Sequence, residues 1–266
     1  MATAAPVYEE RRMSVGRVFQ RAISAITFNP VVVLGLALIV GAVPGLIMTY
    51  LFVQMGVGSP TALQTGAISF RGFIGMTFVS GLITMVISAL VQAALTRATV
   101  SAIDGRRVTF GESLSSALRV VVPLIGLSLL FALGLMLGFV LLIVPGVILM
   151  VVWAVAVPSL VIEREGVFAA FGHSVQLTKG ARWKILGLFL VLGVTYWLLS
   201  IVLGLVGLKM YGATTAAGLG IGNLLGSIII QTIFNMLWGT IQPALYVELR
   251  QWKEGDSMTN LEQVFA

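Results

Sequence analysis

The sequence predicts an all-α fold, a polytopic membrane helix bundle of six transmembrane helices arranged as three hairpins. The chain has 266 residues, of which 58% are hydrophobic and 10% charged, with a mean hydropathy of +1.05. A soluble domain carries about 25% charged residues. Six apolar stretches contain no charged residue, and a bilayer-spanning helix needs roughly 20 such residues. They are residues 31–53, 72–96, 120–143, 147–162, 185–206 and 221–247.

The distribution of basic residues predicts the orientation. Six spans place fourteen of the sixteen Lys and Arg residues on one side, and only Arg71 and Lys209 on the other. Because Lys and Arg are enriched in cytoplasmic loops, we predict that both termini are cytoplasmic. In this cysteine-free chain, a cysteine placed at residue 60 should be labelled only from outside; labelling only from the cytoplasm would contradict the prediction.

We expect residues 1–13 to form a disordered cytoplasmic N-terminus, 14–255 a single six-span membrane domain, and 256–266 a cytoplasmic tail. Residues 120–162 allow two interpretations: one very long helix, or two spans. Pro145 and Gly146 favour a reversal, because proline lacks a backbone donor and glycine permits sharp turns. With five spans, the acidic residues that follow position 162 would lie outside and the termini on opposite sides.

Three repeat units follow from the spacing of similar segments, at about 14–105, 109–166 and 167–255. The first unit begins like the third at an offset of 152 residues, and VQAALTRATVSAIDG (91–105) aligns with IQPALYVELRQWKEG (241–255). Each unit should contain a cytoplasmic amphipathic helix lying in the interface, followed by a two-span hairpin. Capping boxes are predicted where a threonine precedes a glutamate by three residues: Thr109/Glu112 and Thr259/Glu262.

Basic residues of these interfacial helices and their loops are the candidate contacts to anionic lipid headgroups or a partner. They are Arg17, Arg21, Arg106, Arg107, Lys179, Arg182 and Lys184. Glycine pairs four residues apart, at 41/45 and 134/138, permit close approach of helices, either inside the bundle or in self-association.

Uncharged polar residues mark the last span. Gln231, Asn235 and Gln242 fall on one face, either as a polar pathway or as interhelical hydrogen-bonding groups. Glu163 and Glu248 each follow a proline by five residues. They are either carboxylates that gate or dock a basic partner, or charge pairs with Arg164, Arg250 or a neighbouring loop. The single histidine, His173, needs carboxylate partners to bind a metal, and we expect no metal site.

We expect no enzyme activity, no catalytic residues and no cofactor. The sequence contains no phosphate-binding loop, nucleotide-binding glycine motif, zinc-protease motif or nucleophile elbow. The basic residues are spread over short loops and accompanied by acids, which argues against nucleic-acid binding.

The stretch PSLVIEREGVFAAFGHSVQLTKGARWKILGLFLV (158–192) resembles a bacterial family. This is the family of six-span proteins known as the glycerophosphoryl diester phosphodiesterase membrane domain, with its YciC-like membrane relatives. The matching positions are Pro158, Glu163, Gly166, Ala170, Ser174, Leu177 and Gly180. The resemblance implies a bacterial inner-membrane protein, but no phosphodiesterase activity, because a separate soluble domain carries that activity in some relatives.

Two functions fit these observations. The leading hypothesis is a non-catalytic inner-membrane protein that organises lipids or a membrane partner through its amphipathic helices. The alternative is a permease or transporter component for an apolar or lipid-like solute. The expected partners are membrane lipids with anionic headgroups, and a membrane-protein partner or further copies of the chain.

Overall fold

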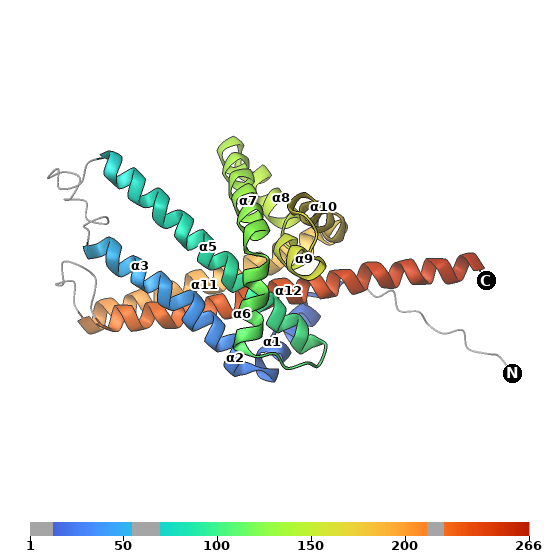
Figure 1. Cartoon of the computed structure of the whole chain (residues 1–266), viewed down its shortest axis with the longest axis horizontal. Coiled ribbons are helices and arrows are strands. Elements are labelled where there is room, and N and C mark those ends of the chain that lie inside the picture. The colour runs from blue at the N-terminus through green and yellow to red at the C-terminus, as the bar shows by residue number, and fades with distance from the viewer. Residues whose placement is uncertain (1–12, 55–69, 212–220, 266) are drawn as a thin grey trace.

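The computed structural model describes residues 13–54, 70–211 and 221–265, and every regular element within these ranges is a helix (Figure 1). Within the described ranges, six helical segments are long and apolar enough to cross a membrane. The predicted all-α, six-span bundle is therefore confirmed. Residues 1–12 of the N-terminal segment predicted over 1–13, and most of two predicted outer connections, 55–69 and 212–220, lie outside the described residues, whereas Met13 is buried. The spans are Pro30–Ile47, Arg71–Ile103, Val121–Leu141, Ile143–Glu163, Arg182–Val202 and Ile228–Lys253.

The spans pair as the three predicted hairpins. In the first, α2 (Pro30–Gly35), η1 (Leu36–Ala42) and α3 (Val43–Gln54) form one continuous span that packs on α5 (Phe70–Ile103). The second pairs α7 (Val121–Leu141) with α8 (Ile143–Val152), and α9 (Ala156–Glu163) completes its second span. The third pairs α11 (Arg182–Tyr211) with α12 (Ile221–Phe265). The tail predicted from residue 256 continues α12.

A short helix precedes each hairpin: α1 (Val15–Phe28), α6 (Phe110–Arg119) and α10 (Val167–Thr178). The capping box predicted at α6 is present, because the Thr109 hydroxyl accepts from the Glu112 backbone and the Glu112 carboxylate from the Thr109 backbone. These bonds hold the pKa of Glu112 below its usual value. The second predicted box, at Thr259, starts no helix, because α12 is helical through this position.

The short helices bury equivalent positions. The residues four, eight and eleven places after each N-cap (Ser14, Thr109 and Gly166) are all buried. Side-chain burial, which the alignment did not use, thus agrees with the three-unit repeat. The nine residues are Val18, Ala22, Ala25, Ser113, Ala117, Val120, Ala170, Ser174 and Leu177.

The same burial departs from the expectation that these helices rest their apolar faces on lipid. Much of each buried face packs on the protein's own spans instead. In α10 the buried face consists of Ala170, Ser174, Leu177 and Thr178, while the large apolar side chain of Phe168 is 80% exposed. The pattern of apolar residues found the helices but did not tell a lipid surface from a protein one.

The short helices also link the units into a closed order. α6 packs on α5, α10 packs on α9, and α1 packs on α12, so each short helix contacts the second span of the unit before it, and the first unit's helix contacts the last span. α5, α9 and α12 contact one another. Three leucines at equivalent places on these helices, Leu95, Leu160 and Leu245, are fully buried.

Two helix breaks differ from the sequence expectation. The chain reverses at Leu142, between α7 and α8, so Pro145 and Gly146 lie in the first turns of α8 instead of at the turn. Proline is tolerated there because the first backbone N–H groups of a helix have no intrahelical partner. A second break, at residues 153–155, separates α8 from α9. The Ser174 hydroxyl accepts from the Val155 N–H and donates to the Val152 carbonyl, which satisfies the interrupted backbone.

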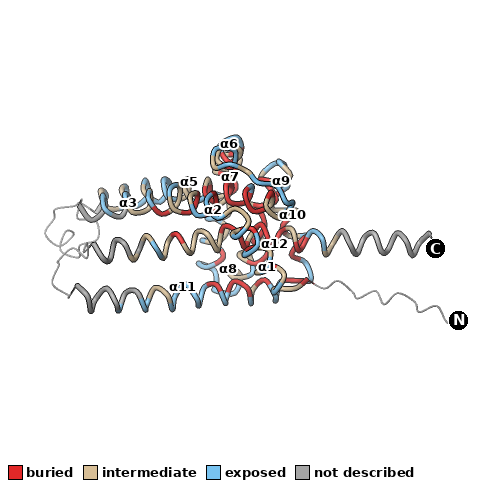
Figure 2. The backbone as a smooth tube through the Cα atoms, turned by 90° about the horizontal axis from the view of Figure 1, so that it is seen from below, coloured by how far each residue is buried: buried red, intermediate tan, exposed pale blue. Residues whose placement is uncertain are grey.

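The bundle has two unlike ends. Buried residues concentrate where the short helices meet α5, α9 and α12, which we call the capped end (Figure 2). Away from it, the outer parts of α3, α5 and α11 carry mostly exposed or half-buried side chains; we call this the open end. The α7–α8 hairpin diverges from the other spans (Figure 1). The divergence positions a cavity between the hairpins.

Candidate membrane-depth cavity

A cavity of about 900 Å³ lies among the three hairpins, lined by η1, α3, α5, α7, α11, α12 and the break between α8 and α9. Pockets for small molecules usually have volumes of about 300–1,000 Å³. All lining residues fall within or between the membrane spans. The three hairpins therefore leave a hollow space at the depth of the spans.

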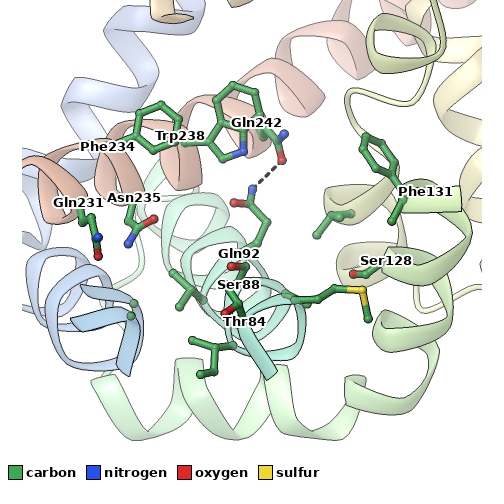
Figure 3. A pocket seen from close by; sticks show the side chains of 18 of the residues that line it. Thr84, Ser88, Gln92, Ser128, Phe131, Gln231, Phe234, Asn235, Trp238 and Gln242 are labelled. Carbon is green, nitrogen blue, oxygen red and sulfur yellow. Dashed lines mark hydrogen bonds between the residues drawn. The ribbon is translucent and has the colours of Figure 1, made fainter. Parts of the chain in front are cut away.

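One wall of the cavity carries the polar face predicted on the last span. Gln231, Asn235 and Gln242 all line it from α12, and Thr84, Ser88 and Gln92 line it from α5 (Figure 3). These side chains border a hollow space, and one of them, Gln242, is also hydrogen-bonded to a neighbouring helix.

Two equivalent glutamines join α5 to α12. The Gln92 amide N–H donates to the Gln242 side-chain oxygen at 2.7 Å (Figure 3). The sequence alignment equated these two residues at an offset of 150, but it gave no reason to expect contact. Val157 of α9 occupies the corresponding place in the second unit and also lines the cavity. The cavity therefore ends at matching positions of the three units.

The floor of the cavity at the capped end is tightly packed. Each of the three residues Gln92, Val157 and Gln242 is followed three positions later by one of the buried leucines described above. A residue three positions on lies one turn further along the same helix face. The cavity is therefore closed toward the capped end by apolar packing.

Glycines let the amides approach η1 and α3. A Cβ on Gly41 would lie 2.6 Å from the Asn235 side-chain nitrogen, and one on Gly45 would lie 3.0 Å from the Gln231 side-chain oxygen. The glycine pair predicted for close helix approach thus accommodates polar side chains of α12. η1 is a π-helix that ends just before Pro44, and such segments are frequent at functional sites.

Aromatic side chains form much of the remaining wall. Phe131, Trp153, Tyr196, Phe234 and Trp238 all line the cavity. Trp153 lies beside Phe131, with ring centroids 5.8 Å apart, and Phe234 stacks near Trp238 at the same separation. None of the described lining residues is charged. The site is therefore neutral, aromatic and amide-bearing.

Outside the cavity, the candidate carboxylates join short helices to spans at the capped end. Glu248, only 3% exposed, pairs with Arg17 at 2.7 Å and Arg21 at 3.2 Å, and it accepts from the Ser14 backbone N–H. Glu163 contacts His173 at 2.5 Å and accepts from the Tyr246 hydroxyl. Glu248 is therefore ion-paired with α1, while Glu163 lies against the His173 ring and 4.0 Å from the Arg250 guanidinium.

These two contacts are repeat-equivalent. Arg21 and His173 each lie seven residues after the N-cap of their short helix. Each contacts a glutamate that follows a proline by five residues: Glu248 for Arg21, and Glu163 for His173. In the remaining interface the corresponding residues are Ala98 and Ser116, which carry no charge. Charge pairing of these carboxylates with Arg250 was among the expectations, and Arg250 lies 4.0 Å from Glu163. The contacts with Arg21 and His173 were not expected, although the 152-residue offset equates these two residues.

The other candidate basic residues have different surroundings. The Lys184 ammonium donates to the Met13 carbonyl at 2.7 Å, and the Arg107 guanidinium lies 5.4 Å from the centre of the Phe28 ring. Arg106, Lys179 and Arg182 are exposed. Because Arg17 and Arg21 are held by Glu248, the exposed basic residues are the better candidates for lipid headgroups.

His173 also lies near a second carboxylate. Ligand atoms of Glu163, Glu165 and His173 lie within 4.8 Å of one another, a proximity that the sequence analysis did not foresee. Arg250 and Lys253 line the same hollow and supply the opposite charge. His173 occupies the place that Arg21 fills in the other interface, so its contact with Glu163 joins α10 to α9 as the contact of Arg21 with Glu248 joins α1 to α12.

Comparison with known proteins gives a family without an assigned function. Residues 13–249 match the family described as a domain of unknown function (DUF7847). Neither a curated protein nor a solved structure matches the chain. The match does not confirm the specific resemblance to the glycerophosphoryl diester phosphodiesterase membrane domain.

Proposed function

We propose that this chain, which belongs to the DUF7847 family, binds an apolar or lipid-like molecule in its membrane-depth cavity and acts as a permease or transporter component. The observation that carries the proposal is the 900 Å³ cavity, closed at the capped end and lined by amides and aromatic rings. We place the protein in a bacterial inner membrane with both termini cytoplasmic, on the basis of its basic loops and of its resemblance to the phosphodiesterase-associated membrane family.

A cavity-filling substitution tests this proposal. Ser128 lines the cavity from α7, whereas its neighbour Leu129 is exposed and does not line it. Ser128→Phe should fill part of the cavity and weaken binding of the molecule by about 5- to 150-fold, because overpacking costs about 1–3 kcal/mol. Leu129→Phe is the matched control. Native mass spectrometry in lipid discs should show a retained molecule in the wild type and in Leu129→Phe but not in Ser128→Phe; equal retention in both variants would contradict the proposal.

A second function, organisation of lipids at the capped end, is favoured by the exposed surface around α10. Phe168 and Trp183 are 80% and 85% exposed, and the exposed basic residues Lys179 and Arg182 follow the same helix. Aromatic and basic side chains together suit the headgroup region. Arg182→Glu with Trp183→Ala should reduce the anionic lipid that copurifies with the protein, whereas unchanged lipid content would count against this function. Arg17 and Arg21 are unsuitable for this test because their replacement also breaks the contact to Glu248.

A further inference from the structure

We propose that the ligand of the cavity is an uncharged amphiphile whose headgroup presents hydroxyl or carbonyl oxygens, the class that includes diacylglycerols and isoprenoid quinones. This inference rests on the proposed function and narrows the class of molecule bound. It draws on three features of the cavity: the absence of charge, the arrangement of amides, and the side from which the cavity is reached.

The charge of the lining excludes ionic headgroups. None of the described residues around the cavity is a Lys, Arg, Asp or Glu. Moving a phosphate or ammonium group to membrane depth without an opposite charge is costly. Phosphate sites in proteins are normally built with Arg or Lys. Here Arg17 and Lys184 instead contact Glu248 and the Met13 carbonyl at the capped end. An anionic phospholipid head therefore lacks a counter-charge in this cavity.

The amides supply the hydrogen bonds that an uncharged headgroup needs. An amide side chain offers two N–H donors and a carbonyl acceptor. The bond between Gln92 and Gln242 uses one donor of the first and one acceptor position of the second. Gln231 and Asn235 lie further along the α12 wall, toward the open end (Figure 3). A headgroup oxygen at this wall can accept from amide N–H groups while aromatic rings enclose its apolar part.

The open side of the cavity suits an apolar tail. Thr84 and Ser88 of α5 and Ala132 of α7 line the cavity and are exposed, so it is accessible between these two helices. Both helices are membrane spans, so this access lies at the depth of the hydrocarbon. A tail can remain among lipid chains while the headgroup occupies the amide wall, which keeps apolar surface out of water.

Tryptophan quenching can measure occupancy directly. Of the five tryptophans, Trp153 and Trp238 line the cavity, while Trp183, Trp197 and Trp252 do not. Replacing the latter three by Phe leaves two reporters at the site. The protein in lipid discs is then titrated with brominated diacylglycerol, brominated isoprenoid quinone and brominated phosphatidylglycerol, with identical bromination of each tail region.

We expect quenching by an uncharged probe to saturate, with its half-maximum at a mole fraction about tenfold lower than for phosphatidylglycerol. This difference corresponds to about 1.4 kcal/mol of binding free energy. Whether the diacylglycerol or the quinone saturates first identifies the source. Saturation by phosphatidylglycerol at an equal or lower mole fraction would overturn this inference and leave the proposed function standing. Quenching that rises only in proportion to mole fraction for every probe would overturn both.

A double variant and its control test whether the amides cause the preference for an uncharged headgroup. Gln231→Leu with Asn235→Leu keeps side-chain size but removes the hydrogen-bonding groups, and it should reduce the preference for the uncharged probe about tenfold. Gln20→Leu, at an exposed position of α1, is the matched control and should keep the full preference. An unchanged preference in the double variant would show that the amides do not select the headgroup.

Discussion

Replacing Glu248 by glutamine should lower the free energy of unfolding by about 2–3 kcal/mol. The carboxylate is 3% exposed and faces two guanidinium groups, so the substitution leaves both without their counter-charge. Removing one partner of a buried ion pair costs about 3–5 kcal/mol. We expect a smaller effect because Arg17 is 42% exposed, and water can solvate part of its charge.

Thermal unfolding in lipid discs measures this effect. Glu165→Gln is the matched control, because Glu165 is an exposed carboxylate at the same end, and its unfolding midpoint should change little. A double-mutant cycle of Glu248→Gln with Arg21→Gln should show coupling, since the two side chains contact each other. Additive effects in the cycle, or equal midpoints for Glu248→Gln and Glu165→Gln, would refute a stabilising role of this pair.

Replacing Gly138 by alanine should destabilise the α7–α8 hairpin by about 1–3 kcal/mol. A Cβ at this position would lie 2.9 Å from the Gly146 Cα and 3.1 Å from its nitrogen, so the backbone of α8 would have to move. The two helices approach closely here because neither residue has a side chain. Part of the cavity wall is built on α7, so the displacement should also weaken ligand binding.

Gly187 provides the control for this substitution. It lies inside α11, and a Cβ there would meet no atom within 4 Å. Gly187→Ala should be neutral or stabilising by up to about 1 kcal/mol, because alanine is the better helix former. The two unfolding midpoints, measured in the same lipid, should therefore shift in opposite directions or differ clearly. Equal shifts of the two midpoints would mean that the close approach of α7 and α8 at Gly138 does not limit stability.

The fold could be predicted from sequence because its main determinants are local. Apolar length gives each span, and the Thr109 box gives the start of α6. The break at residues 153–155 could not be predicted in the same way, since the hydroxyl that satisfies it comes from Ser174, on a later helix. The sequence pattern puts the turn at Pro145, because proline favours a helix end. The chain instead turns at Leu142, because proline is also tolerated in the first turn of the helix that follows.

The polar residues of the candidate site could be predicted from the sequence, but the cavity that they line could not. The polar face of Gln231, Asn235 and Gln242 follows from helical spacing, and all three residues line the cavity. The cavity itself depends on how far the α7–α8 hairpin diverges, which is a property of packing between units (Figure 1). The contacts of the two glutamates at the capped end likewise join residues more than 200 positions apart in one interface and ten in the other.

The closed order of the units has a consequence for synthesis. Arg17 leaves the ribosome 231 residues before Glu248, its partner in the mature protein. At about 5–20 residues per second, that interval is on the order of 10–50 s. α6 and α10 can meet α5 and α9 as soon as they are made, and α1 can likewise pack on α5. The contact of α1 with Glu248, however, can form only after α12 has been made, so the packing between the first and the third unit is completed last.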